Sequence, residues 1–304
     1  MRVLITGGAG FLGSHLAERF LAGGHEVVGI DNLSTGRKAN WPKDAELVVG
    51  DIRNLTTFWP KPWDVIYHCA ASYRDRGAWE ADATTNVLGT INVVRLAQHS
   101  GAHLVYFQTS LCYGPKPVSP VKLDAPLDPH GSYAVSKTAG EAYIRDSGIP
   151  FTSLRLANIY GPRNLSGPVP TFYQRLTTGK PCTVVRSRRD FVYVEDLIRV
   201  AAEAWKHPGI FHVASGRDYP IITLYQAVVE ALGVAVPEPT TVPRGADDVA
   251  TLLLDASLTQ ATFDWMPVWS LREGVREAVR WYRDNPKATE TTYSHLSMAT
   301  EVSH

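Results

Sequence analysis

The sequence predicts an α/β fold: a doubly wound parallel sheet followed by a smaller mixed α/β region on its C-terminal side. Three observations predict it. A short apolar, β-branched run at the N-terminus is followed at once by the glycine turn Gly7-Gly8-Ala9-Gly10-Phe11-Leu12-Gly13. Up to about residue 158, runs of strand length alternate with segments of helical periodicity. From Tyr160-Gly161-Pro162-Arg163 onward this alternation gives way to turn-rich sequence.

The composition is that of an ordinary globular protein and argues against several functional classes. The 304 residues suffice for one large or two modest domains, and 30 basic residues balance 30 acidic ones. No basic block indicates a nucleic-acid surface, and no apolar run reaches the ~18 residues of a membrane span. We therefore expect no nucleic-acid or membrane partner, and a cytoplasmic location. Three scattered cysteines predict reduced thiols and no metal site.

The first predicted unit is a strand, a glycine turn, a helix and a second strand. The helix has Leu12, Leu16 and Phe20 on one face, and the strand over residues 26–30 stops at Asp31. An acidic residue ~20 positions beyond the glycines is the dinucleotide-binding context of a Rossmann-type fold. Without Cβ atoms, the turn lets backbone amides reach a pyrophosphate at the helix N-terminus.

The choice of dinucleotide depends on Asp31. A carboxylate there accepts hydrogen bonds from the adenosine ribose diol and repels a 2′-phosphate, which favours NAD over NADP. Arg37 and Lys38 follow closely and are able to contact a phosphate, so the preference for NAD is strong but is not settled by the sequence.

Four further strands are expected to complete the sheet, over residues 47–52, 64–68, 104–108 and 151–156. Asp51 lies at the end of the first of them as a candidate adenine contact, and Ala70 lies just beyond the second, where small residues let backbone approach a cofactor. The helix predicted over residues 83–98 contains Asn86, which we interpret as a local structural hydrogen bonder.

The candidate catalytic residues come after the strand predicted over residues 104–108. It ends at Thr109-Ser110, and a later helix carries Tyr133 and Lys137, whose four-residue spacing places them on one helix face. An ammonium one turn away and a cationic cofactor would both favour the phenolate of Tyr133, which brings it toward the range of a useful base. Alone, this spacing is common by chance.

The C-terminal region is expected to bind substrate. It contains Arg188 to Val194, a helix from about residue 196 to 206 and a short strand over 210–213. Thr223 with Gln226 and Ser270 with Glu273 have capping-box spacing and predict two further helix starts. The predicted organisation is a dinucleotide domain over 1–158, a substrate domain over 159–285 that is partly interleaved with the first, and a polar tail over 286–304.

Taken in order, these motifs resemble the extended short-chain dehydrogenase/reductase family of NAD-dependent nucleotide-sugar epimerases and dehydratases. The likeness is greatest to UDP-hexose 4-epimerases and to epimerase/dehydratases of bacterial surface-polysaccharide biosynthesis. It covers about residues 1–285 and rests on the following segments: 6–13, 31–33, 51–53, 68–71, Tyr133 with Lys137, 155–162 and 189–191; residues 243–248 and 293–296 also look like that subgroup.

The resemblance implies roles for individual residues. The catalytic group would be Thr109, Tyr133 and Lys137, with Ser110 as the alternate hydroxyl. Cofactor contacts would come from Gly7, Gly10, Phe11, Leu12, Gly13, Asp31, Asn32, Asp51, Ile52, Ala70, Tyr133 and Lys137. Substrate contacts would come from Ser110, Asn158 and Arg189, and more weakly from Arg244 and Asp247. The arginine fork suits the diphosphate of a nucleotide sugar.

One departure from the family pattern narrows the expected reaction. Dehydratases of this family carry Asp and Glu directly after the catalytic hydroxyl, where this chain has Ser110 and Leu111. Leu111 cannot transfer a proton, so epimerisation is favoured over dehydration. Cys112 stands where the family often has Val, and we interpret it as a small buried residue.

The resulting hypothesis is an NAD-dependent 4-epimerase of a nucleotide-activated hexose or hexuronic acid, with UDP as the favoured nucleotide. Tyr133 would remove the C4 hydroxyl proton while hydride leaves C4 for NAD, and hydride would return to the opposite face of the 4-keto sugar. Alternatives are a nucleotide-sugar dehydrogenase, dehydratase or decarboxylase with the same 4-keto chemistry, and a non-catalytic dinucleotide sensor. The family also implies a homodimer through the helices of Ala83 and Tyr133.

Overall fold

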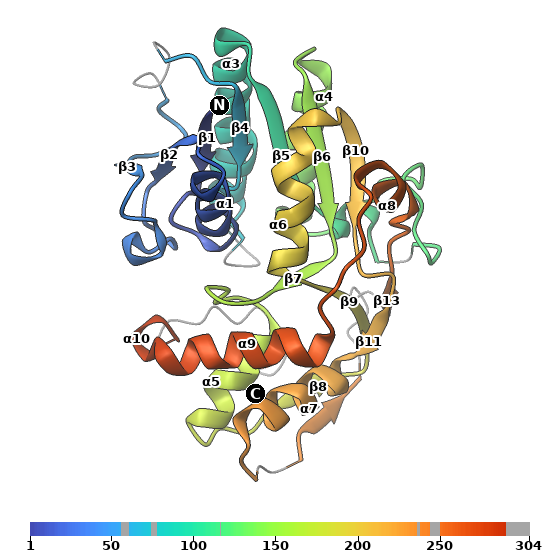
Figure 1. Cartoon of the computed structure of the whole chain (residues 1–304). Coiled ribbons are helices and arrows are strands. Elements are labelled where there is room, and N and C mark those ends of the chain that lie inside the picture. The colour runs from blue at the N-terminus through green and yellow to red at the C-terminus, as the bar shows by residue number, and fades with distance from the viewer. Residues whose placement is uncertain (56–60, 74–77, 116, 236–237, 244–249, 290–304) are drawn as a thin grey trace.

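The centre of the computed structural model is one seven-stranded parallel sheet, which confirms the predicted fold class (Figure 1). The structure describes residues 1–55, 61–73, 78–115, 117–235, 238–243 and 250–289. The strand order is β10-β6-β5-β4-β1-β2-β3, so the direction of winding reverses between β1 and β4. The strands are β1 (Arg2–Thr6), β2 (Glu26–Asp31), β3 (Glu46–Val49), β4 (Val65–His68), β5 (His103–Thr109), β6 (Phe151–Leu156) and β10 (Gly209–Val213).

Both faces of this sheet are covered by helices, because successive strand side chains point to opposite sides. In β1, Val3 and Ile5 belong to one apolar cluster with Leu16 of α1, whereas Leu4 belongs to a second cluster with Leu96 of α3. Helices α1 and α6 cover the first face, and α3 and α4 the second (Figure 1). These four helices are α1 (Phe11–Ala22), α3 (Thr90–Ser100), α4 (Ser132–Asp146) and α6 (Val194–Glu203).

The helix predicted over residues 83–98 is more irregular than its periodicity indicates. A short helix α2 (Trp79–Asp82) runs into a π-helical stretch, η3 (Ala83–Gly89), which continues as α3. Asn86 is buried in that stretch, where its amide donates to Ser72 O (2.9 Å) and Ser136 Oγ (2.9 Å) and accepts from Ser72 N (2.8 Å). The prediction that Asn86 is a structural hydrogen bonder is confirmed.

The C-terminal half of the chain contributes to two bodies of structure. Strand β10 pairs in parallel with β6 and completes the large sheet, and helix α6 covers one face of that sheet, while most of the remaining elements form a smaller region below it (Figure 1). The division at residue 158 stays a prediction. The elements of the smaller region and its connections are β7 (Asn158–Tyr160), α5 (Pro168–Thr177), β8 (Thr183–Val185), β9 (Arg188–Tyr193), β11 (Asp218–Pro220), α7 (Ile221–Leu232), β12 (Thr240–Val242), β13 (Thr251–Leu252), α8 (Ser257–Phe263), α9 (Leu271–Asp284) and α10 (Pro286–Thr289).

One of the two predicted capping boxes is wrong. Helix α7 already begins at Ile221 after Pro220, and no side chain caps it, so Thr223 lies inside the helix. Ile221 is buried, and its amide donates to Ser187 O (3.1 Å). These contacts start helix α7 two residues before Thr223, the position that the Thr223 and Gln226 spacing predicted. The box at the start of α9 is present: the Ser270 hydroxyl accepts from Glu273 N, and the Glu273 carboxylate accepts from Ser270 N.

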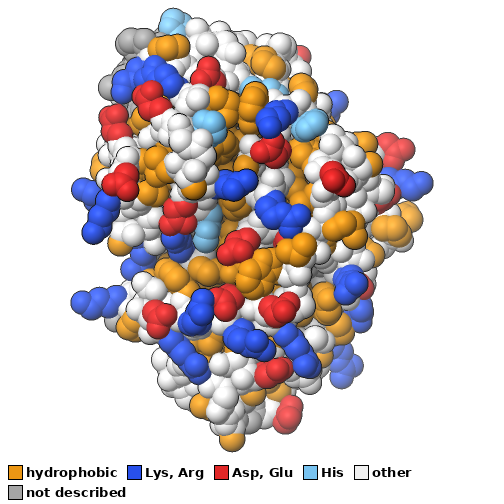
Figure 2. Space-filling view, in the orientation of Figure 1, with side chains coloured by type: hydrophobic (Ala, Val, Ile, Leu, Met, Phe, Trp, Pro, Cys, Tyr) orange, Lys and Arg blue, Asp and Glu red, His pale blue; other side chains and the backbone are white. Residues whose placement is uncertain are grey.

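The visible surface carries interspersed charges of both signs, in agreement with the even charge balance (Figure 2). Within the described ranges, no helix combines the length and apolar character that a bilayer crossing requires. The same part of the chain contains no group of three or more His, Cys, Asp or Glu side chains placed to hold a metal ion. Cys69, Cys112 and Cys182 are free thiols.

Candidate active site

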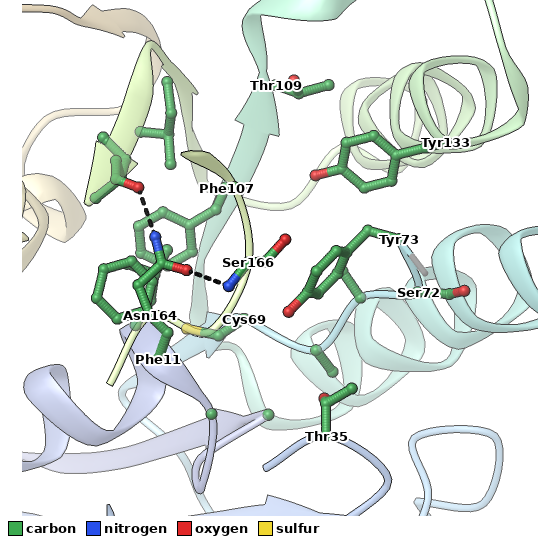
Figure 3. Close-up of a pocket in the computed structure, with 18 of the residues that line it drawn as sticks. Phe11, Thr35, Cys69, Ser72, Tyr73, Phe107, Thr109, Tyr133, Asn164 and Ser166 are labelled. Carbon is green, nitrogen blue, oxygen red and sulfur yellow. Dashed lines mark hydrogen bonds between the residues drawn. The ribbon is translucent and has the colours of Figure 1, made fainter. Parts of the chain in front are cut away.

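A cavity of about 640 Å³ lies beyond the carboxyl ends of β1 and β4, at the point where the winding of the sheet reverses. Ligands of open α/β sheets bind at this position. The glycine turn, the loop after β4, the end of β5, helix α4 and the segment from Leu156 to Pro170 all contribute to its wall. Figure 3 shows side chains from both the large sheet and the later segment directed into it.

The glycine turn fits a dinucleotide because its backbone is packed too tightly for side chains. A Cβ at Gly7, whose φ is +65°, would lie 2.6 Å from Ala70 N, and one at Gly13 would lie 2.3 Å from Gly7 O. Helix α1 begins directly after Gly10 without any side-chain cap. Its first amides are therefore left for an anion, as a pyrophosphate at a helix N-terminus requires.

Asp31 is held in place at the end of β2. Its carboxylate accepts from Ala9 N (3.0 Å) and Leu33 N (2.7 Å), and a Cβ at Gly36 would lie 2.6 Å from Oδ2. Burial raises the pKa of Asp31, and the two backbone donors oppose that rise. Arg37 donates to Lys287 O (3.1 Å) and Ala288 O (2.9 Å) in α10 and is not part of the cavity wall. A ribose diol therefore fits beside Asp31 better than a 2′-phosphate does.

Asp51, after β3, is a second fixed carboxylate on the cavity wall. Arg53 binds it through Nε (2.9 Å to Oδ1) and Nη2 (2.8 Å to Oδ2), and Asn32 Nδ2 donates to Oδ2 (3.1 Å). These bonds, those from Arg53 first, lower the pKa of Asp51 to about 2. It is therefore anionic at neutral pH and keeps lone pairs for a donor such as an adenine amine.

Tyr133 and Thr109 meet in the same cavity from different elements. Tyr133 extends from the first turn of α4, Thr109 ends β5, and Tyr73 stands beside Tyr133 with ring centroids 6.4 Å apart (Figure 3). Figure 3 shows both tyrosine hydroxyls directed into the cavity. Thr109 Oγ1 accepts from Leu111 N (3.2 Å), which leaves its hydroxyl proton free to donate to a ligand.

Burial in the chain alone acts against the activation of Tyr133 that Lys137 and a cationic cofactor are expected to provide. Burial, then Tyr73 and Asp82, raise the pKa of Tyr133 above its usual value. Burial also lowers the pKa of Lys137 to about 7, and its Nζ lies 3.9 Å from the centroid of the Tyr106 ring. Burial therefore favours the protonated form of Tyr133 in the chain alone, and a cation, either Lys137 or one that arrives with the cofactor, would favour the phenolate.

Gln108 connects the two catalytic elements and is a residue that sequence reasoning missed. Its side-chain oxygen accepts from Thr109 N (2.8 Å), and its nitrogen donates to Lys137 O (3.1 Å). The Tyr106 hydroxyl donates to the same carbonyl at 2.9 Å. A buried glutamine inside a predicted apolar strand was the available signal, because such an amide needs partners.

A buried polar network holds the other end of α4. Arg155 of β6 donates to both Glu141 oxygens (3.2 and 2.6 Å) and to the Tyr113 hydroxyl (2.7 Å). Tyr113 is 2.6 Å from His212 Nε2, and His212 Nδ1 is 2.9 Å from Asp255 O. Arginine only donates and a carbonyl only accepts, so Tyr113 donates to Nε2 and His212 carries its proton on Nδ1.

The candidate substrate residues lie on the side of the later segment. Asn158 and Arg189 both line the cavity, and Asn158 Nδ2 donates to Asp190 O (3.0 Å). Arg188 does not share their position, because it is exposed and pairs with Asp218 (2.7 Å). Arg244 and Asp247 lie outside the described residues. Ser110 lines the cavity next to Thr109.

Leu111 and Cys112 differ in exposure. Leu111 is 38% exposed and lines the cavity, so a hydrocarbon side chain stands beside Thr109. Cys112 is fully buried in the apolar core, and burial raises the pKa of its thiol to about 12. This agrees with the interpretation of Cys112 as a small core residue.

The structure brings nearly all predicted site residues to one cavity. Among the described residues, Gly13 is the exception because it does not line the cavity. It lies against Gly7 and allows α1 to pack closely on the glycine turn. Those that line the cavity are Gly7, Gly10, Phe11, Leu12, Asp31, Asn32, Asp51, Ile52, Ala70, Thr109, Ser110, Tyr133, Lys137, Asn158 and Arg189.

Comparison with known proteins gives consistent matches over most of the chain. Residues 3–214 match the model of the NAD dependent epimerase/dehydratase family. The chain is 32% identical to a UDP-glucose 4-epimerase of Mycolicibacterium smegmatis over 93% of its own length and 99% of that protein. It is also 32% identical to UDP-glucuronic acid decarboxylase 1 of Arabidopsis thaliana, over 93% of this chain and 70% of that one.

Several solved structures also resemble the chain over nearly its whole length. The Bordetella bronchiseptica enzyme WbmH in complex with NAD+ has a TM-score of 0.89 at 43% identity, covering 93% of this chain and 98% of that chain. WbmG of the same organism, with NAD and UDP, has a TM-score of 0.87 at 38% identity, covering 98% and 99%. DesIV, a dTDP-glucose 4,6-dehydratase of Streptomyces venezuelae, has a TM-score of 0.86 at 28% identity, covering 94% and 98%.

Proposed function

The chain belongs to the NAD dependent epimerase/dehydratase family, and we propose that it epimerises a UDP-activated hexose or hexuronic acid at C4 through a transient 4-keto sugar. The predicted family and NAD as the cofactor are both confirmed. The enzyme modifies a nucleotide sugar with NAD. The finer assignment rests chiefly on one observation, the apolar Leu111 beside Thr109 and Tyr133 in a cavity wall.

In this proposal each residue of the catalytic group has a separate role. NAD, when bound, would supply the hydride acceptor and donor for C4 of the sugar. Tyr133, as phenolate, removes the C4 hydroxyl proton and later returns it, while Thr109 hydrogen-bonds the same oxygen. Lys137, one turn along α4, stabilises the phenolate, and Gln108 keeps the Thr109 backbone and α4 together.

Epimerisation is favoured over elimination of water because of what lies next to the reacting carbon. Removing water across C5 and C6 needs an acid and a base besides Tyr133. Among the described residues of the cavity wall, the carboxylates are Asp31 and Asp51, both at the adenosine end. Leu111 places a hydrocarbon side chain next to Thr109, so the described part of the wall has no carboxylate there for that second proton transfer.

We expect purified protein with NAD to interconvert a UDP-hexose or UDP-hexuronic acid with its C4 epimer, without net NADH release. NMR of the products of UDP-glucose, UDP-N-acetylglucosamine and UDP-glucuronic acid measures this. The proposal is wrong if none of these gives a C4 epimer while another nucleotide sugar is turned over. Loss of water or carbon dioxide, or stoichiometric NADH, would support the dehydratase, decarboxylase or dehydrogenase alternatives.

A non-catalytic dinucleotide sensor is the less favoured function. A protein that only senses NAD has no need of a proton-transfer group, whereas Thr109, Tyr133 and Lys137 all line the cavity here. Absence of turnover with every nucleotide sugar, together with tight NAD binding, would favour the sensor.

The substrate contacts in this proposal come from the later segment. Ser110, Asn158 and Arg189 would hold the sugar and diphosphate, since a guanidinium fork matches phosphate oxygens. Arg244 and Asp247 are proposed as weaker contacts. A water-soluble nucleotide sugar as substrate fits a cytoplasmic location.

We further propose a homodimer through the helices of Ala83 and Tyr133. Leu88 in η3 and Val135 and Tyr143 in α4 are 54%, 50% and 50% exposed, so these two helices have large apolar side chains uncovered in the single chain. Light scattering is expected to give twice the chain mass of 33.4 kDa. Val135→Glu with Tyr143→Glu should shift the mass to that of one chain, and a wild-type monomer would contradict the proposal.

A further inference from the structure

Arg163 follows β7 in the turn 161–164 and has no role in the predicted site. Arg163 Nη1 is buried and has no hydrogen-bond partner, while Nη2 pairs with Glu18 of α1. A buried guanidinium N–H without an acceptor is costly, and native structures rarely leave one so. Arg163 also lines the cavity, so a ligand there is in a position to supply the missing acceptor.

The turn that carries Arg163 is fixed against the first half of α1. His15 Nε2 lies 3.1 Å from Pro162 O, and since a carbonyl only accepts, His15 donates this bond. The Tyr282 hydroxyl donates to Asn164 O at 2.7 Å, and Asn164 also lies beside Phe11 in the cavity (Figure 3). Arg163 itself adopts φ +68°, a conformation that is uncommon outside glycine and concentrates at functional sites.

The positions of the cationic side chains in the cavity indicate which part of a ligand Arg163 would face. Among the described residues of the wall, the cationic side chains are Lys137, Arg163 and Arg189. Lys137 lies against Tyr106 in the catalytic group, and Arg189 belongs to β9 on the substrate side. Arg163 is the one of the three that contacts α1, whose N-terminus supplies only about half a positive charge to an anion.

We propose that Arg163 is a cofactor-binding residue whose Nη1 donates a charge-assisted hydrogen bond to the diphosphate of NAD. Helix α1 and the glycine turn supply backbone donors to one side of the diphosphate, and the turn 161–164 supplies a side-chain cation to the other. Glu18 holds the guanidinium through Nη2 and leaves Nη1 for the ligand. This role does not depend on which sugar the enzyme turns over.

Binding to cofactor-stripped protein tests the proposal by calorimetry with three probes: NAD, ADP-ribose and adenosine. Arg163→Ala should weaken NAD and ADP-ribose roughly 10- to 100-fold, the range for one hydrogen bond to a charged group, and leave adenosine unchanged. Arg163→Lys, which keeps the charge but loses the fork, should give an intermediate loss for the two diphosphates. Unchanged ADP-ribose affinity in Arg163→Ala would overturn the proposal.

Glu18→Gln is the matched control, because the two hypotheses predict opposite signs for it. If Arg163 binds the diphosphate, Glu18→Gln removes the neighbouring negative charge but keeps a side-chain oxygen that accepts from Nη2, so ADP-ribose affinity stays equal or rises. If Arg163 only ties the turn to α1, Glu18→Gln and Arg163→Ala should weaken all three probes together, and the proposal fails. Retained adenosine binding in Arg163→Ala shows that the variant is folded, and Arg163→Lys provides the same comparison if Arg163→Ala does not fold.

Discussion

Tyr133→Phe is expected to lower kcat by roughly 10²- to 10⁴-fold, the usual contribution of a positioned acid–base group, while the variant stays folded and binds NAD. The phenyl ring still fills the space beside Tyr73 and keeps the edge contact of the two rings. What the variant loses is the hydroxyl that exchanges a proton with C4. Progress curves with a UDP-hexose, together with the NAD content of the purified protein, measure both properties.

Tyr73→Phe is the matched control for this prediction. Its hydroxyl also points into the cavity, but Tyr73 lies on a loop after β4 and has no lysine one helical turn away (Figure 3). We expect a change in kcat of less than about tenfold, as for loss of an ordinary positioning hydrogen bond. Unchanged turnover in Tyr133→Phe would sink the assigned site, and equal losses in both variants would show that Tyr133 acts only as part of the wall.

The sequence was enough to place the residues of the dinucleotide half near one another, because each of them depends on local geometry. Gly7 and Gly10 follow β1 directly, and Asp31 ends the next strand, so strand and turn patterns are enough to place them. Tyr133 and Lys137 needed only helical spacing. The sheet could be predicted for the same reason, since strands β1 to β6 are short apolar runs separated by recognisable turns.

What the sequence did not predict depends on contacts between distant residues. Strand β10 was expected in the smaller region, but it pairs in the large sheet with β6, 57 residues earlier in the chain. Gln108 and Arg163 have no local motif, and their importance follows from Lys137 O and Glu18, which only the fold brings near them. The raised pKa of Tyr133 likewise comes from burial, which a spacing of four residues does not encode.

Disrupting the buried pair of Arg155 and Glu141 is expected to cause the largest loss of stability. Their side chains are 3% and 1% exposed, and Glu141 also accepts from Ser153 Oγ at 2.5 Å. Removing one partner leaves the other charge buried without compensation, which costs about 3–5 kcal/mol. We therefore expect Glu141→Leu to lower the free energy of unfolding in urea by about that amount.

Glu26→Gln is the surface control for this prediction. Glu26 pairs with Arg2 at 3.0 Å, but the two side chains are 56% and 29% exposed, so solvent screens the pair and its loss should change the free energy of unfolding by less than about 1 kcal/mol. The double variant Arg155→Met with Glu141→Leu should recover part of the stability, because it removes both buried charges. Glu141→Leu that is as stable as the control would contradict the prediction.

The pair of Arg155 and Glu141 also lies close to the catalytic elements. Glu141 lies one turn beyond Lys137 on α4, and Arg155 binds Tyr113 at the end of the short helical turn that follows Thr109. If the network positions the catalytic elements, the double variant should regain stability without regaining kcat, since Tyr113 still lacks its arginine donor. Urea unfolding and turnover measured on the same preparations separate the two effects. Recovery of kcat in parallel with stability would show that the network only stabilises the fold.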